Sequence, residues 1–234
     1  MLAIALLLAS AVFAASASLS LNSVFIPATD PRVLVSGRAS FNADGSRSFD
    51  WEGVAFTVSV INANFFSMNV TSTSSGLNRV ITHISNPDTT RGLWYEQTRH
   101  WILPGNSVLV VAANLDREKN TLRVFFELEP HFAGIDAPSS FFTVNNFVLD
   151  SGDAVETAPL SRRIEILGDS ISAGYGSVGV DNACPVRKWS SSNYGTYGRM
   201  FCDYFKANCS VLAWSGRGVR KGGKRARARA FAPI

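Results

Sequence analysis

The sequence predicts an N-terminal all-β domain, a jelly roll or sandwich, followed by the beginning of an α/β domain with a parallel sheet. Residues 20–155 alternate apolar and polar positions with a period of two, which is typical of half-buried strands. Near Asp150 the composition shifts to that of a linker, and residues 164–214 then have the pattern of a strand, a helix and a strand. The predicted division is residues 1–17 as a signal peptide, 18–155 as the β domain, 156–219 as the start of the α/β domain, and 220–234 as a disordered basic tail of low complexity.

The first residues have the composition of a secretory signal. Residues 2–14 carry no charge, and Ala15, Ser16 and Ala17 follow as a cleavage site. The apolar run is shorter than the about 20 residues of a membrane-spanning helix, and no later stretch is long and apolar enough to span. We therefore expect a secreted, extracellular chain without a membrane span. A buried first helix or a retained anchor is the alternative.

The net charge of +4 comes from the end of the chain. Of the 22 Lys and Arg residues, 7 follow Gly216, so residues 1–216 carry 15 basic and 18 acidic residues, a net charge of −3. Binding to nucleic acid needs a basic face on a folded unit, and we expect no nucleic-acid partner. A hydrophobic content of 46% also excludes a largely disordered chain.

Two runs show the alternation of the β domain most clearly. In residues 54–60 large apolar side chains alternate with small or polar ones, and Leu122, Val124, Phe126 and Leu128 repeat the pattern in the run 122–128. The polar positions in and just after the second run are Arg123, Glu127 and Glu129. Residues 108–111 are all apolar and are expected to form a strand buried on both faces. Strands at this spacing, separated by turn sequences, predict an antiparallel sandwich.

Several aromatic and histidine residues of the β domain have two interpretations. Four aromatic side chains could stack on sugar rings or pack in the core and at its rim, and they are Trp51, Trp94, Tyr95 and Trp101. The three histidines are His83, His100 and His131. None has a metal-ligand spacing with another ligand residue, and we expect neither a metal nor another cofactor.

The three cysteines, Cys184, Cys202 and Cys209, lie in the last quarter of the chain. An odd number leaves one thiol over, and a bridge from Cys184 to either of the others is possible. Asn69 and Asn208 begin sequons and are candidates for glycosylation.

A candidate nucleophile follows the first strand of the α/β segment. The apolar residues 164–167 run into Gly168, Asp169 and Ser170, and Gly174 follows. Such a turn presents a serine hydroxyl at the carboxyl end of a parallel strand, where open α/β sheets place their sites. A helix over residues 193–206 and a strand over 211–214 are predicted next, before Ser215 and Gly216.

These motifs resemble a known family. Residues 163–176 resemble the first block of the SGNH, or GDSL-type, hydrolases. With the preceding β domain and the later Ala-Trp-Ser-Gly-Arg-Gly at residues 213–218, the chain resembles carbohydrate esterase family 2. The resemblance implies a secreted acetyl esterase of xylan and related polysaccharides, with a jelly roll joined to a flavodoxin-like α/β domain.

The resemblance also implies the roles of particular residues. Ser170 would be the nucleophile, and the backbone N–H groups of Ser170 and Gly216 would form part of the oxyanion hole. Gly168, Asp169 and Gly174 support the motif, with Asp169 structural rather than the acid of a catalytic triad.

Two further blocks of the family pattern do not occur in the sequence. These are a Gly-x-Asn-Asp block, which supplies an oxyanion donor, and an Asp-x-x-His block, which supplies the base; no histidine follows His131. We therefore expect an incomplete α/β domain and an inactive, truncated chain, because a serine without a base stays protonated. The tail is a polybasic binding segment or out-of-frame sequence, and we favour the second because the resemblance ends where the tail begins.

The predicted function is that of a secreted serine esterase that removes acetyl groups from a polysaccharide such as xylan. Its expected partner is the acetylated polysaccharide, and the chain is expected to be a monomer. The alternatives are a non-catalytic carbohydrate-binding jelly-roll protein and a generic SGNH lipase or esterase.

Overall fold

The computed structural model describes residues 23–85, 96–115, 118–129, 140–181 and 188–216. Several predicted features lie outside the described residues, namely the signal peptide, the basic tail, Trp94, Tyr95, His131 and Cys184.

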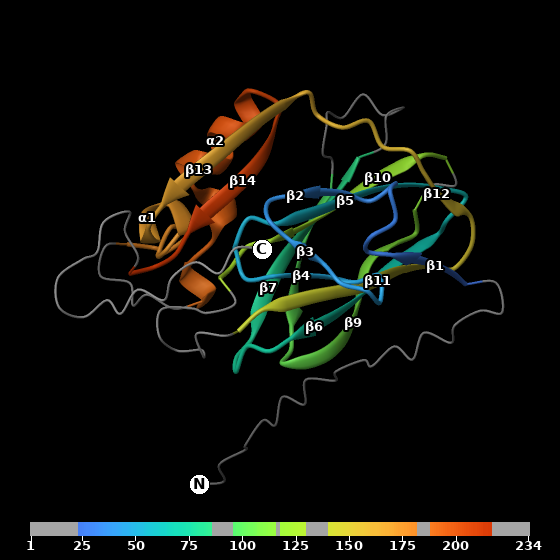
Figure 1. The fold of residues 1–234 in the computed structure, drawn as a ribbon, viewed down its shortest axis with the longest axis horizontal. Coiled ribbons are helices and arrows are strands. Elements are labelled where there is room, and N and C mark those ends of the chain that lie inside the picture. Colours follow the sequence, from blue (N-terminus) through green and yellow to red (C-terminus); the bar gives the residue numbers. More distant parts are fainter. Residues whose placement is uncertain (1–22, 86–95, 116–117, 130–139, 182–187, 217–234) are drawn as a thin grey trace, which may run out of the picture.

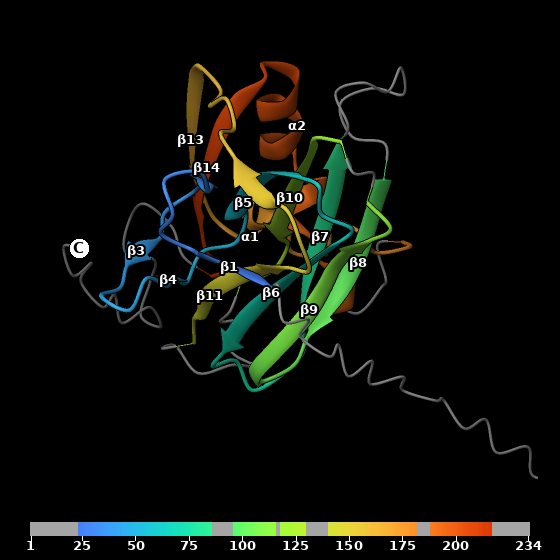
Figure 2. The ribbon, with the colours of Figure 1, turned by 90° about the vertical axis from the view of Figure 1, so that its right-hand side faces the viewer.

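Two antiparallel sheets of six strands each form most of the described chain (Figure 1, Figure 2). The strands of the first sheet are β1 (Val24–Pro27), β3 (Ser40–Phe41), β4 (Arg47–Phe49), β6 (Phe65–Ser72), β9 (Gly105–Ala113) and β11 (Phe142–Leu149). They pair in the order β3-β4-β11-β6-β9, and β1 also pairs with β11. The strands of the second sheet are β2 (Leu34–Ser36), β5 (Ala55–Ile61), β7 (Asn78–Ser85), β8 (Glu96–Ile102), β10 (Asn120–Phe126) and β12 (Asp153–Val155). They pair in the order β12-β5-β10-β7-β8, and β2 also pairs with β5.

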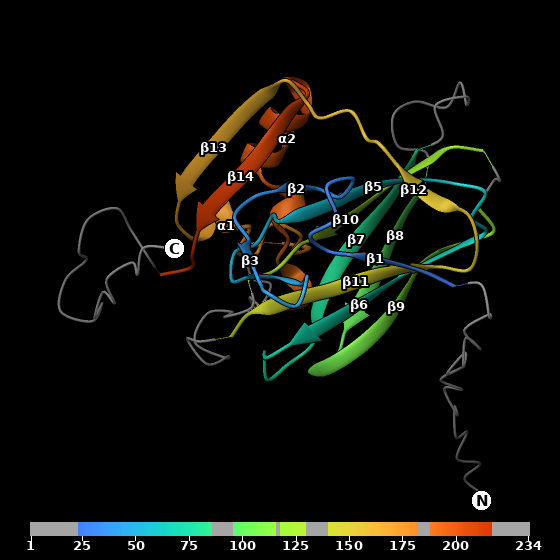
Figure 3. The same cartoon turned by 45° about the vertical axis from the view of Figure 1, so that its right-hand side comes forward.

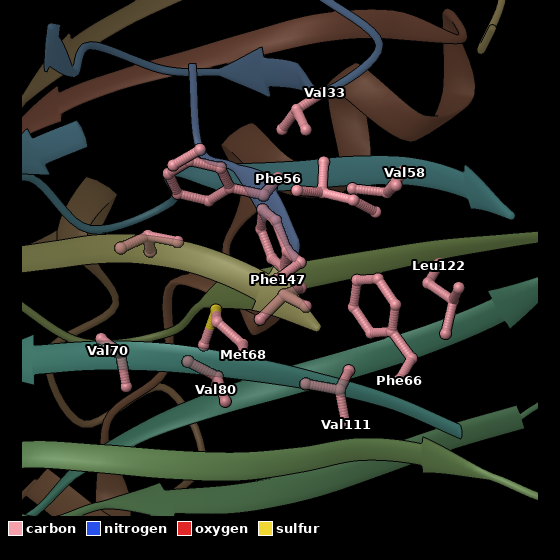
Figure 4. Close-up of a cluster of buried hydrophobic side chains, with 14 of the residues drawn as sticks. Val33, Phe56, Val58, Phe66, Met68, Val70, Val80, Val111, Leu122 and Phe147 are labelled. Carbon is pink, nitrogen blue, oxygen red and sulfur yellow. The ribbon is translucent and has the colours of Figure 1, made fainter. Parts of the chain in front are cut away.

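The large apolar side chains of the two sheets face one another and form the main core (Figure 4). Phe56 of β5 and Phe147 of β11 are fully buried, with their ring centroids 5.9 Å apart. Phe66 of β6 stacks on Phe147 at 5.3 Å. Burial of one such side chain stabilises a fold by about 1.5–3 kcal/mol, so this face fixes the register of the strands. The β-rich architecture predicted for this region is confirmed.

The strand expected over residues 108–111 differs from its prediction. These residues lie in β9, which is an edge strand, and Val108 and Val110 are 67% and 38% exposed. The expectation that this strand is buried on both faces is wrong, because only its inner face has a sheet opposite.

The C-terminal elements form a small unit beside the second sheet (Figure 1, Figure 3). Strands β13 (Arg162–Gly168) and β14 (Ala207–Ala213) pair in parallel. Between them lie α1 (Ser170–Ala173), the 3-10 turns η1 (Lys188–Ser190) and η2 (Asn193–Gly195), and α2 (Tyr197–Tyr204). Helix α2 is shorter than the predicted helix because Thr196 caps its N-terminus by accepting a hydrogen bond from the N–H of Arg199.

Cys202 of α2 and Cys209 of β14 form a disulfide with a Cα–Cα distance of 5.8 Å. This pairing excludes the bridge from Cys184 that the sequence left possible. It joins the helix to the following strand, so it fixes the connection between them.

The outer face of the second sheet is covered by the C-terminal unit rather than by solvent. Ile81 and Phe125 are buried there, and the ring of Tyr194 lies 5.6 Å from that of Phe125. Glu127 is fully buried and Arg123 is 7% exposed. The polar positions of the 122–128 run therefore do not face water. No helix in the described part of the chain is long and apolar enough to cross a membrane.

Candidate active site

Ser170 is the first residue of α1 and follows β13 directly after Gly168 and Asp169. Gly168 is the last residue of β13 and lies close to Ser172. A Cβ at position 168 would lie 2.0 Å from Oγ of Ser172. The main-chain carbonyl of Ser170 accepts hydrogen bonds from the N–H groups of Gly174 at 3.1 Å and Tyr175 at 2.8 Å. Among the described residues no side chain is hydrogen-bonded to the Ser170 hydroxyl. The sequence motif is thus a compact turn in which no described side chain is a hydrogen-bond partner of this hydroxyl.

The Asp169 carboxylate is used in the local structure of this turn. Asp169 has an extended backbone, and its Oδ1 accepts a hydrogen bond of 3.1 Å from the N–H of Ile171. An aspartate at a helix N-terminus accepts a hydrogen bond from a backbone N–H group that has no partner within the helix. This contact supports a structural role for Asp169.

A neighbouring loop supports the turn from the other side. Gly174 has φ of +91°, and a Cβ there would lie 2.2 Å from the carbonyl oxygen of Ser192. The N–H of Ser192 donates to the carbonyl of Gly174 at 3.0 Å. Nδ2 of Asn193 donates to the carbonyl of Ser172 at 2.8 Å. Residues 190–193 therefore hold the turn that carries Ser170.

A second turn follows the adjacent strand at the same edge of the parallel pair. Because Ala213 is in register with Gly168, Ser215 and Gly216 leave β14 beside the point where Ser170 leaves β13. The N–H of Ser215 donates to Oε1 of Glu129 at 2.7 Å. The structure brings the two sequence-predicted turns to one edge, and a carboxylate of the sandwich anchors the second one.

Aromatic packing also fixes this second turn. Nε1 of Trp214 donates to the carbonyl of Asp50 at 3.1 Å. The rings of Trp51 and Trp214 lie 5.3 Å apart at an angle of 32°. Of the two interpretations of Trp51, this contact supports packing.

Two buried carboxyl groups of the sandwich lie near the second turn. Burial raises the pKa of Glu129 to about 7, while its hydrogen bonds from Ser215 lower it. Glu52 is fully buried, and its pKa is raised well above the usual value by burial and next by the charge of Glu129. The sequence did not identify Glu52, and it marked Glu129 only as a polar position after a strand.

A buried ion pair connects the sandwich to the loop that supports Ser170. Nε of Arg79 lies 2.6 Å from Oε2 of Glu127, and Nη2 of Arg79 donates to the carbonyl of Ser191 at 2.8 Å. Oγ of Ser192 donates to Oε1 of Glu127 at 2.5 Å. The backbone of Ser191 and the side chain of Ser192 are therefore held by charged groups of the second sheet.

The described histidines belong to the sandwich. His83 lies on β7 with its ring 5.0 Å from that of Tyr194, and burial lowers its pKa to about 3. His100 lies on β8, and burial lowers its pKa too. Within the described residues no group of three or more His, Cys, Asp or Glu side chains could hold a metal ion.

The two sequon asparagines lie on strands. Asn69 lies on β6, and Asn146 lies on β11. Nδ2 of Asn69, the atom that a glycan would join, donates a hydrogen bond of 2.6 Å to Oδ1 of Asn146. Asn208 is half-buried on β14. Both sites remain predictions.

Comparison with known proteins identifies what this architecture is similar to. No family model matches the chain. Among curated proteins, the cellulase/esterase CelE of Acetivibrio thermocellus is 33% identical over 61 residues, which cover 26% of this chain and 8% of that protein.

Solved structures match over most of the chain. An acetyl xylan esterase of Butyrivibrio proteoclasticus matches with a TM-score of 0.70 and 19% identity, over 86% of this chain and 50% of its own. A family 2 carbohydrate esterase of Clostridium thermocellum, solved with cellohexaose, matches with a TM-score of 0.67 and 20% identity, over 80% and 52%. A family 2 enzyme of Myceliophthora fergusii, which also has a carbohydrate-binding domain, matches with a TM-score of 0.61 and 26% identity, over 80% and 50%.

The chain spans about half the length of these solved esterases. Its described part combines their fold with a serine turn at the edge of a parallel strand pair. The chain is similar in structure to the carbohydrate esterases of family 2, which are hydrolases of ester bonds.

Proposed function

We propose that this chain is the sandwich and the first part of the α/β domain of a secreted esterase that removes acetyl groups from a polysaccharide such as xylan. The observation that carries the proposal is the placement of Ser170 and Gly216 after adjacent, in-register parallel strands. The proposal includes two statements about the fold. The sandwich is a jelly roll, and the parallel pair of β13 and β14 is the start of an SGNH-type sheet.

In the proposed reaction Ser170 Oγ attacks the acetyl carbonyl carbon and the sugar hydroxyl leaves, which gives an acetyl-enzyme that water then hydrolyses. The N–H groups of Ser170 and Gly216 stabilise the negative oxygen that develops during each attack. A general base must take the Ser170 proton, and the sequence has no histidine after His131. The chain alone is therefore proposed to be inactive, since loss of a triad member costs about 10⁴-fold or more in rate.

The first experiment measures hydrolysis of p-nitrophenyl acetate by the full chain beside Ser170→Ala. Both are expected to give the same background rate. Activity that disappears with Ser170→Ala would contradict the proposed inactivity.

The second experiment adds the further part of the proposed α/β domain. Residues 23–216 are fused to the segment that follows the matching strand in the Butyrivibrio acetyl xylan esterase, and acetate release from acetylated xylan is measured. The fusion is expected to release acetate, and Ser170→Ala within it is expected to abolish release. A folded fusion that keeps its activity after Ser170→Ala would refute the assignment of the nucleophile.

A non-catalytic carbohydrate-binding function is the second candidate, because two exposed tryptophans, Trp101 and Trp189, both contact Arg79. Trp101 is 45% exposed with its ring centroid 5.5 Å from the Arg79 guanidinium carbon, and Trp189 is 55% exposed with its carbonyl 3.4 Å from Nη1 of Arg79. Exposed aromatic rings can stack on sugars. This function predicts that Trp101→Ala weakens binding to insoluble xylan while Ser170→Ala does not.

A further inference from the structure

The outer face of the second sheet contains an arginine that forms no ion pair with any described carboxylate. Arg123 lies on β10, opposite His83 of β7 and Thr57 of β5. It is only 7% exposed, and it forms no hydrogen bond or ion pair within the described residues. Burying a guanidinium without an ionic partner lowers the stability of the fold, and a negative group bound beside it would offset this cost.

The neighbouring acids are already engaged by other arginines. Glu127 lies 2.6 Å from Arg79 and 3.4 Å from Nε of Arg99. Asp203 accepts a hydrogen bond of 3.0 Å from Nε of Arg199 and a second one from its Nη2. The charged and titratable groups described on this face are Arg79, Arg99, Arg123, Arg199, Glu127, Asp203, His83 and Tyr194. Four guanidinium groups thus share two carboxylates.

Arg123 and Arg199 converge on one place. Their guanidinium carbons lie 5.8 Å and 5.4 Å from the centroid of the same ring, that of Phe125. Nε of Arg123 and Nη1 of Arg199 are both buried and have no hydrogen-bond partner among the described residues. Two unused N–H donors, one from a strand and one from a helix, therefore lie close to the same aromatic ring.

The electrostatics agree with this geometry. Burial, and next the charge of Arg199, lower the pKa of Arg123 to about 9, while the charges of Asp203 and Tyr194 raise it by less. Arg123 is therefore still charged near neutral pH. Arg99 and Asp203 are 48% and 49% exposed, so the cluster reaches the surface at its rim.

We propose that Arg123 and Arg199 bind one small oxyanion, of the carboxylate or sulfate class, between the second sheet and α2. Guanidinium groups present planar pairs of N–H donors that match the oxygen pairs of carboxylates and sulfates. The anion supplies the negative charge that the face lacks and joins the sandwich to the helix. It comes from a free inorganic ion or from the carboxylate of an acidic sugar.

The test measures thermal unfolding of the full chain in sodium sulfate, sodium glucuronate and sodium chloride at equal ionic strength. At ten times its dissociation constant a ligand raises the folding equilibrium constant about 11-fold, a shift in Tm of about 3–6 °C for a chain of this size. Sulfate also stabilises proteins without binding them, so the response must saturate and must depend on Arg123.

The variants are Arg123→Met and, as a matched control, Arg163→Met, which removes an exposed arginine of β13. The wild type and Arg163→Met are expected to show the saturable shift, and Arg123→Met is expected to lose it. A shift in sulfate alone assigns the site to inorganic ions, and one in glucuronate assigns it to acidic sugars. Equal shifts in all three salts, or a shift that survives in Arg123→Met, would overturn the proposal.

A second measurement does not depend on the variant folding. In ¹⁵N-labelled wild-type protein, titration with sulfate or glucuronate is expected to move the Nε–H resonances of Arg123 and Arg199 with one common saturation curve. The unfolding experiment gives the ligand concentration at which the shift in Tm is half-saturated. If the two resonances do not move at up to 50 times that concentration, binding between these side chains is contradicted.

Discussion

Replacing Glu127 by Gln tests how strongly the sandwich holds the loop behind Ser170. Glu127 is fully buried and binds Arg79, Arg99 and Ser192. Glutamine keeps the shape and one acceptor oxygen but leaves the Arg79 charge, which is 7% exposed, without a counter-charge. Loss of one partner of a buried ion pair costs about 3–5 kcal/mol, and the retained hydrogen bond places the expected loss at about 3 kcal/mol.

The matched control is Glu165→Gln. Glu165 pairs with Arg38 at 2.9 Å, but the two side chains are 47% and 53% exposed. Exposed pairs of this kind contribute about 0–1 kcal/mol. The two substitutions make the same chemical change, so their difference isolates the effect of burial.

Urea unfolding followed by tryptophan fluorescence measures both variants. With a slope of about 2 kcal/mol per molar urea, Glu127→Gln is expected to lower the midpoint by about 1.5 M and Glu165→Gln by less than 0.5 M. The double variant Arg79→Met/Glu127→Gln is expected to recover part of the loss, because it leaves no buried charge at Arg79. Midpoints of the two single variants within 0.3 M of each other would refute the proposed role of the ion pair.

Three further predictions concern other contacts. Replacing Cys202 and Cys209 by Ser opens a short loop and is expected to lower the free energy of unfolding by about 2–3 kcal/mol, measured in urea, whereas an unchanged midpoint contradicts the bridge. The pKa of Glu129 is raised to about 7 in the folded chain, so the folded state binds its proton more tightly than the unfolded state. This contribution to the free energy of unfolding, about 3 kcal/mol, is present below pH 4.5 and is lost as the pH rises through 7. Glu129→Gln is expected to flatten this slope in unfolding measured from pH 4.5 to 8, and an equally steep slope in the variant contradicts the assignment. Gly174→Ala places a Cβ 2.2 Å from the backbone oxygen of Ser192 at a positive φ and is expected to cost at least 2 kcal/mol, so a variant as stable as wild type contradicts the turn geometry.

The sandwich could be predicted because its signal is local. Alternation in residues 54–60 and 122–128 places Phe56 and Leu122 on the inner face, where the structure has them. The same alternation places Arg123 and Glu127 on the opposite face of the strand, but alternation does not show what covers that face. The cover comes from Tyr194 and its neighbours, nearly 70 residues later in the chain.

The serine turn was also predictable, since Gly168 and Ser170 occur in a recognisable order after an apolar strand. The residues that support the turn could not be predicted. The contacts of Glu129 with Ser215 and of Glu127 with Ser192 join residues 86 and 65 positions apart, and nothing in their local sequence marks them as partners. Their burial depends on the docking of the C-terminal unit, which is a tertiary property.

The covering of the second sheet has a consequence for limited proteolysis. Residues 158–161 of the linker are exposed, so a protease can cut there. The two fragments would still be joined by the packing of Tyr194 on Phe125 and by the hydrogen bonds of Arg79 with Ser191 and of Glu127 with Ser192, so they should elute together under native conditions. A sandwich produced without its partner would instead expose this apolar and charged face. We therefore expect the two parts of the chain to unfold together even when the covalent connection between them is cut.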